Sequence, residues 1–144
     1  MNNQENLPVK TNNETTIVET NDQESLINVV INCMATESRS DKIALINALD
    51  RADQKLMDNI GKTLEVKGIY AETHISRKTG EPVCRVLLID TEGKSYATGS
   101  FVFLNSLKNI VSVLGVPTSE EPLKIQITQV AMEKGNSLKA KVIE

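Results

Sequence analysis

Aromatic residues are scarce in this chain of 144 residues, which contains two tyrosines, two phenylalanines and no tryptophan. The core must therefore come from valine, isoleucine, leucine and alanine, and a chain of this length can bury such a core as one domain. No apolar run reaches the roughly 18 residues of a membrane span, and the first residues lack the basic and apolar segments of a secretory signal. We expect a soluble, cytoplasmic protein that makes no membrane contact.

Residues with catalytic or metal-binding chemistry are also few. Cys33 and Cys84 stand apart without a CxxC or Cys/His spacing, and His74 is the single histidine. We therefore expect two reduced thiols and no metal site. No phosphate-binding glycine loop, nucleophile elbow or HExxH motif occurs, and Glu120 and Glu121 lie in a polar loop where a solvated surface is expected. The sequence predicts a protein that is not an enzyme and needs no cofactor, with an enzyme that uses Cys84 or His74 as the alternative.

The acidic residues are concentrated in the first part of the chain. Residues 1–58 contain 5 Lys/Arg and 10 Asp/Glu, whereas residues 59–144 contain 11 and 9. Such an asymmetry suits a domain that binds a polyanion and carries an acidic appendage. Residues 1–22 are rich in Asn, Thr, Glu and Gln and have few apolar groups, so we expect them to form a disordered acidic N-terminal tail.

Residues 23–40 are expected to form an apolar arm and a linker. The segment 25–34 is apolar and β-branched, a composition that suits a strand and a short docking helix equally well. Because it lies between the polar tail and the polar break ATESRSD, we favour an arm that packs on its own domain or on a neighbouring subunit over a plain strand of the domain. The residues expected in an oligomerisation contact are Leu26, Ile27, Val29, Val30 and Ile31.

Residues 41–144 are expected to form the folded domain. Apolar residues at three- and four-residue spacing predict an amphipathic leading helix over 41–58, with Ser40 as its N-cap. From residue 62 the apolar pattern has period two, and Gly68 separates two apolar phases, which predicts a bulge in one long strand ending at Ile75. The other expected elements are strands 83–90 and 94–100, a helix over 103–115, and strands 123–133 and 138–143.

Five antiparallel strands with a helix between the third and the fourth are the element order of the OB-fold, a mainly β, partly open β-barrel. OB-folds bind oligonucleotides across strands two and three and between the flanking loops. Lys94, Tyr96 and Thr98 share one face of the third strand, so we expect Tyr96 to face outward beside Arg85. A site for single strands needs cations and a flat side chain on which bases stack. The residues expected to bind DNA are Tyr96, Arg85, Lys94, Phe101, Arg77, Lys78, Tyr70, Lys134, Lys139 and Lys141.

Several of these side chains have a structural alternative. Tyr96 can pack under the first helix, because tyrosine is often half buried. One of Phe101 and Phe103 belongs to the core, and the helical phase favours Phe103. Exposed strand lysines such as Lys139 and Lys141 can serve solubility or edge protection instead of phosphate contact.

Four segments of the chain resemble a known family. They are ALINALDRADQKLMDNIGKTLEVKGIY, RVLLIDTEGKSYATGS, FLNSLKNIVSVLGVPTSEEPLKIQITQV and the closing LKAKVIE. Together they are similar to the small OB-fold single-stranded DNA-binding proteins of Gram-positive conjugative plasmids and phages. The resemblance implies single-stranded DNA as the ligand, no catalysis, no cofactor, and self-association as a dimer or a filament on DNA.

This resemblance also suggests a role in plasmid transfer or phage replication, where such a protein coats DNA without sequence specificity. The housekeeping bacterial proteins of this type rely on tryptophan, which is absent here. With so few aromatic rings, we expect phosphate neutralisation to carry most of the affinity, with a steep salt dependence and poor discrimination between single and double strands. The alternative function is an OB-fold protein-interaction module of a transfer or secretion complex.

Overall fold

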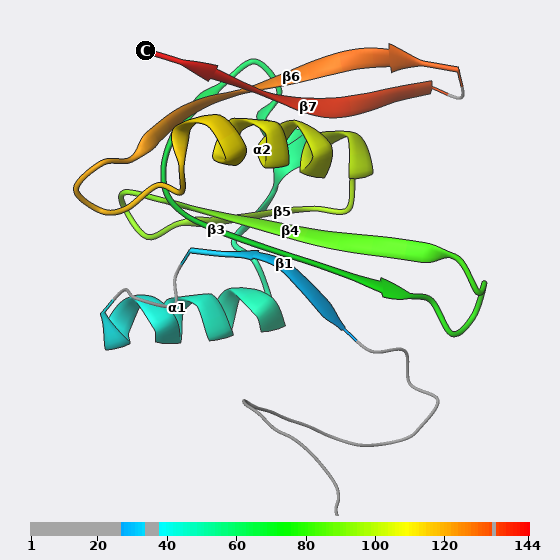
Figure 1. The fold of residues 1–144 in the computed structure, drawn as a ribbon, viewed down its shortest axis with the longest axis horizontal. Helices are drawn as coiled ribbons and strands as arrows, with labels where there is room; N and C mark the ends of the chain where they lie inside the picture. Colours follow the sequence, from blue (N-terminus) through cyan, green and yellow to red (C-terminus); the bar gives the residue numbers. More distant parts are fainter. Residues whose placement is uncertain (1–26, 34–37, 134) are drawn as a thin grey trace, which may run out of the picture.

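The computed structural model describes residues 27–33, 38–133 and 135–144, and the chain is mainly β. Figure 1 shows a curled, open sheet with two helices, an arrangement consistent with an OB-like fold. In chain order the elements are β1 (Asn28–Asn32), α1 (Arg39–Asp50), β2 (Gln54–Lys55), the 3-10 helix η1 (Leu56–Asn59), β3 (Thr63–Ile75), β4 (Pro82–Asp90), β5 (Ser95–Thr98), α2 (Phe101–Leu114), β6 (Leu123–Met132) and β7 (Gly135–Ile143).

The sheet has the strand order β2-β5-β4-β3-β6-β7, and β1 pairs with β3 beside this path. All neighbouring strands are antiparallel except β2, which runs parallel to β5. The five strands expected from the sequence correspond to β3 to β7. The short strands β1 and β2 extend the sheet beyond them.

The bulge predicted at Gly68 is confirmed. The register between β3 and β4 shifts between Val66 and Gly68. Before this shift β3 pairs with β6, and after it β3 pairs with β1, while β4 follows β3 along most of its length. A bulge bends and twists a strand. One bent strand therefore contacts three partners and gives the sheet its curl.

The sheet is apolar on both faces where β4 crosses its centre. Val86 and Leu88 belong to the main core between the curled sheet and α2, whereas Leu87 and Ile89 pack on the outer face beneath α1. A strand covered on both faces needs a continuous apolar run, which the sequence VLLI provides. Full burial of one such side chain contributes about 2 kcal/mol of transfer free energy.

Helix α2 covers the edge of β7 that none of the described strands pairs. Ser100 caps the helix by accepting a hydrogen bond from the Phe103 amide, and Gly115 ends it with a φ of 84°. The Ser106 hydroxyl accepts a hydrogen bond from the Ala140 amide of β7 at 2.9 Å. An uncovered strand edge invites pairing with another chain, so these contacts close this edge of the sheet.

The leading helix is shorter than predicted. Helix α1 begins at Arg39 with Ser38 as its cap, and it ends at Asp50, so the predictions of a Ser40 cap and a helix over 41–58 were wrong. The Asp53 carboxylate accepts hydrogen bonds from the Ser95 amide at 2.8 Å and the Ser95 hydroxyl at 3.1 Å. These contacts pull the chain out of the helix and align β2 with β5, and the periodic apolar residue Leu56 enters the core from η1.

The apolar segment after the acidic tail is a strand of this domain. Residues 28–32 pair with β3 of the same chain, so the segment packs on its own domain as a strand that extends the sheet. Ile31 is buried in the core of its own chain, and Val30 is partly buried against that core, so neither presents a fully exposed side chain to a neighbouring subunit. Ile27 and Val29 are exposed. Leu26 and the predicted tail over 1–22 lie outside the described residues.

Both cysteines are buried in the fold. Cys33 is buried where β1 ends and donates its thiol to the Ile69 carbonyl at 3.3 Å, while burial raises the pKa of the Cys84 thiol. Neither helix in the described ranges is long and apolar enough to cross a membrane.

Candidate functional site

Tyr96 is not a surface stacking platform. Its side chain is 5% exposed and lies in the main core, so the prediction that it faces outward beside Arg85 was wrong. Tyr96 pairs with Leu88 across β5 and β4, and cross-strand partners share a face. Its hydroxyl donates to Asp90 at 3.0 Å. Burial, followed by this hydrogen bond, raises the pKa of Tyr96 to about 12.

Small residues occupy the outer face of β5 instead. Ser95 is held outward by Asp53, and Ala97 lies opposite Leu87 on the face that α1 covers. Shifting the phase of a strand by one residue moves every side chain to the other face. The outward expectation for Tyr96 failed because its phase was assigned from a strand of only four residues.

Tyr70 does lie on the outer face of the sheet, but helix α1 covers it. The ring is 8% exposed and packs in the cluster of Leu45 and Ala48. Its hydroxyl donates to Glu72 at 2.8 Å, and burial is the main cause that raises the pKa of Tyr70 to about 12. Neither tyrosine is therefore available for base stacking.

Phe101 is the aromatic residue that stays accessible. Its side chain is 38% exposed, while Phe103 is fully buried, which confirms the core assignment of Phe103. Hydrogen bonds of the two residues before Phe101 hold it between the β3–β4 and β6–β7 hairpins. The Cys84 thiol of β4 donates to the Gly99 carbonyl at 3.4 Å, and the Ser100 hydroxyl lies 2.9 Å from the Ser137 hydroxyl. In Figure 1 the β3–β4 and β6–β7 hairpins extend toward the same side of the molecule, where α2 begins.

A pocket of about 750 Å³ opens on the outer face of β3, β4 and β5, beyond the end of α1. Its volume is within the range of small-ligand sites. The walls are mainly apolar, with a few polar groups. The lining residues are Ile27, Lys55, Met57, Glu72, His74, Cys84, Arg85, Ala97, Thr98 and Gly99.

Arg85 fixes one wall of this pocket. One guanidinium nitrogen donates to the Leu49 carbonyl at 2.7 Å and the other donates to Glu72 at 3.1 Å. On the same wall the Nδ1 atom of His74 is buried and has no hydrogen-bond partner within the described part of the chain. A buried polar atom without a partner is costly and uncommon, so this wall can still accept a polar ligand.

Exposed cations lie beside the pocket. Arg77 and Lys78 lie in the β3–β4 turn, three and four residues beyond His74, and Lys55 lines the pocket from β2. The Ser76 amide bonds the Glu81 carbonyl, and the Gly80 amide bonds the Ser76 carbonyl, so the turn is held together internally. We call the pocket, this turn and Phe101 together the hairpin face.

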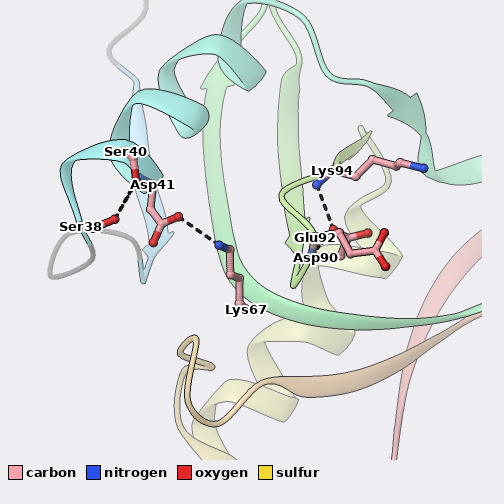
Figure 2. A network of polar contacts seen from close by, with 7 residues as sticks. All are labelled: Ser38, Ser40, Asp41, Lys67, Asp90, Glu92 and Lys94. Atoms are coloured by element: carbon pink, nitrogen blue, oxygen red, sulfur yellow. Dashed lines mark hydrogen bonds and ion pairs between the residues drawn. The ribbon is translucent and has the colours of Figure 1, made fainter.

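Other predicted DNA-binding residues lie elsewhere. Lys94 is in the β4–β5 turn, at the opposite end of β4 from the hairpin, and Figure 2 shows its side chain directed away from the carboxylates of Asp90 and Glu92. Lys139 and Lys141 are exposed on β7, opposite residues of β6 that also face outward. Lys134 lies outside the described residues.

Helix α1 is fixed over the sheet by an ion pair that the sequence did not reveal. Lys67 of β3 donates to Asp41 in the first turn of α1 at 3.0 Å (Figure 2). The pocket residues Lys55 and Met57 were also missed, because the sequence placed them in the helix over 41–58. The parallel pairing of β2 with β5 positions these two residues, and no local sequence pattern predicts that pairing.

The described residues contain no group of three or more His, Cys, Asp or Glu side chains that could hold a metal ion. A family model described as phage single-stranded DNA-binding protein matches residues 24–141, a range that includes both helices and the pocket-lining residues. No curated protein and no solved structure matches the chain.

Proposed function

The chain belongs to the phage single-stranded DNA-binding proteins, whose family model matches residues 24–141, and from this premise we propose that it coats or protects single-stranded DNA without sequence specificity. The family match is the observation that carries the proposal. In this proposal the protein binds DNA and catalyses no reaction. It serves plasmid transfer or phage replication. In the same proposal β3 to β7 are the five strands of an OB-fold, with α2 between the third and the fourth.

We assign DNA binding to the hairpin face. Single strands offer unstacked bases and phosphates, so a site for them combines a ring with nearby cations. Phe101 offers the exposed ring, and Arg77 and Lys78 offer charge on the adjoining turn. Stacking on one ring contributes about 1–3 kcal/mol, which leaves phosphate contacts as the larger part of the affinity.

The lysines of the β6–β7 hairpin provide a second, weaker contact in this proposal. Lys124 of β6 is exposed, as are Lys139 and Lys141 of β7. They face outward from strands whose inner side chains belong to the main core. A DNA strand that runs from the hairpin face past Phe101 reaches these lysines when it continues along the β6–β7 hairpin. Self-association of neighbouring copies on DNA, with Ile27 and Val29 as exposed contacts, completes the coating model.

Fluorescence anisotropy of a labelled oligo-dT tests this assignment. The double variant Arg77→Ala/Lys78→Ala should bind about tenfold more weakly at low salt, because two phosphate contacts are lost. Lys94→Ala is the matched control, since Lys94 is equally exposed but lies at the other end of β4. An equal loss in both variants would reject the hairpin face as the site. Absence of binding by the wild-type protein would reject DNA binding itself.

A protein-interaction module is the second candidate function, and exposed apolar residues favour it. Val113 and Leu114 at the end of α2, together with Val116 in the following loop, are all exposed. Single exposed apolar side chains are ordinary, whereas exposed apolar side chains that gather in a contiguous patch mark interaction sites. This function predicts no oligo-dT binding by the wild-type protein, so the same titration separates the two.

A further inference from the structure

Two large apolar side chains line the pocket and are nevertheless exposed. Ile27, just before β1, is 59% exposed, and Met57 of η1 is 57% exposed. They belong to segments that are distant in the sequence, and the fold brings both to one cavity. Exposed apolar side chains around a cavity are typical of ligand sites. A ligand that covers them must have an apolar surface of its own.

Two polar groups of the pocket have hydrogen-bonding capacity left for this ligand. The Nδ1 atom of His74 is buried and has no partner among the described residues. The Thr98 hydroxyl accepts the Ser100 amide at 3.2 Å, and its own proton has no acceptor in the described part of the chain. Glu72 and Arg85 already form an ion pair at 3.1 Å and offer no unpaired charge. The pocket therefore suits an apolar ligand with a polar edge.

A nucleobase combines these two kinds of surface. Proteins that take up a single base contact its faces with aromatic or apolar side chains and bond its edge. The sulfur of a methionine contacts aromatic rings favourably. Met57 can therefore contact the face of a base while His74 and Thr98 bond its edge.

The exposed ring of Phe101 lies close to the pocket. Gly99 lines the pocket and Phe101 follows two residues later, so their Cα atoms are at most about 7 Å apart. The exposed Lys55 of β2 also lines the pocket and places an ammonium group there for a phosphate. One base of a strand can therefore stack on Phe101 while another base of the same strand enters the pocket.

We propose that one base of the bound strand enters this pocket, and that the pocket favours thymine over adenine. The inference rests on the proposed function, because the base arrives as part of the bound DNA. Thymine carries an N–H between two carbonyl oxygens, so it can bond the His74 nitrogen in either tautomer and also accept the Thr98 proton. Adenine has no carbonyl oxygen. Its amino donor beside one ring acceptor satisfies both groups in only one tautomer of His74.

The first test compares the full-length wild-type protein with Met57→Gln and with a matched control, Leu114→Gln. Leu114 is 55% exposed, close to the value for Met57, but it lies at the end of α2 and does not line the pocket. Each protein is titrated with labelled oligo-dT and with an abasic strand of the same length, which keeps the phosphates and lacks the bases. The imidazole NMR signal of His74, the single histidine, is recorded in each titration.

We expect Met57→Gln to bind oligo-dT about fivefold more weakly than wild type, and the abasic strand within about twofold of wild type. Leu114→Gln should match wild type on both strands. The His74 signal of the wild-type protein should shift with oligo-dT and not with the abasic strand. Equal weakening of Met57→Gln on both strands, or a His74 signal that oligo-dT leaves unchanged, would overturn the inference while DNA binding itself stands.

The second test addresses the preference for thymine. Wild type and His74→Leu are titrated with oligo-dT and oligo-dA, and the ratio of the two affinities is compared between the proteins. The different stiffness of the two strands cancels in this comparison, as does any loss of folded protein. We expect the preference for oligo-dT to fall about threefold or more in His74→Leu, because the variant cannot bond the base edge. An unchanged ratio would overturn the preference.

Failure of the proposed function looks different, because the wild-type protein then binds neither strand. Free thymidine and free deoxyadenosine test the pocket alone in that case. A His74 signal that shifts more with thymidine than with deoxyadenosine would support the pocket as a base site. Equal shifts, or no shift with either nucleoside, would overturn it.

Discussion

Arg85 of β4 and Glu72 of β3 lie opposite each other in the antiparallel register and form an ion pair at 3.1 Å on the pocket wall. The Glu72 side chain is only 4% exposed, whereas that of Arg85 is 41% exposed. Glu72 also accepts the Tyr70 hydroxyl, and Arg85 also donates to the carbonyl of Leu49 at the end of α1. Arg85 therefore has a structural role in addition to any contact with a ligand.

Arg85→Ala should destabilise the fold by about 2 kcal/mol. The substitution leaves the buried Glu72 carboxylate without its cation and removes the tie between β4 and α1. Urea denaturation at neutral pH measures the loss. Arg51→Ala is the matched control, since Arg51 is an exposed arginine next to the same helix end, and it should change stability by less than about 0.5 kcal/mol. Equal stabilities of both variants would contradict the structural role.

Substitutions of Tyr96 and Phe101 should affect different properties. The first should change the stability of the fold, and the second should change DNA binding. Phe101→Leu removes the exposed ring and should weaken oligo-dT binding by about 1–3 kcal/mol with little change in thermal stability. Tyr96→Leu should lower the melting temperature, because it opens a cavity in the core and removes the hydrogen bond to Asp90, yet leave DNA affinity unchanged. A loss of affinity only in Tyr96→Leu would reinstate that tyrosine as the stacking residue.

Alkaline pH should destabilise the protein through its tyrosines. The folded-state pKa values of Tyr70 and Tyr96 are raised to about 12 from the usual tyrosine value of 10.0, so folding favours the neutral phenols. Their contribution to stability is complete below pH 10 and is lost as the pH rises toward 12, since the unfolded chain releases these protons first. The urea midpoint measured across this range checks the prediction. The variant Tyr70→Phe/Tyr96→Phe should show a flatter profile, and an identical slope would contradict it.

Much of the fold follows from local sequence patterns. The period-two runs located β3 to β7, the helical spacing located α2, and the change of phase at Gly68 located the bulge. Each of these patterns reports a face buried along a single element. Phe103 was placed in the core for the same reason.

The candidate site was less predictable, because contacts distant in sequence decide it. The bonds from Asp53 to Ser95 select the phase of β5 and break the helical pattern after Asp50. Neither face of β5, with the sequence SYAT, is apolar enough to show which of its side chains point into the core. The cover that α1 places on Tyr70 likewise depends on packing against another element. Both tyrosines that were predicted as stacking platforms are buried by such contacts. A local turn pattern was enough to predict that the cations of the β3–β4 turn are exposed.

The most direct test of the account is a titration of the wild-type protein with labelled oligo-dT at about 50 mM and about 200 mM salt. The account predicts saturable binding at the lower salt that weakens about tenfold or more at the higher salt, because phosphate neutralisation dominates a surface with one exposed ring. No binding at the lower salt, or an affinity that salt leaves unchanged, would contradict it.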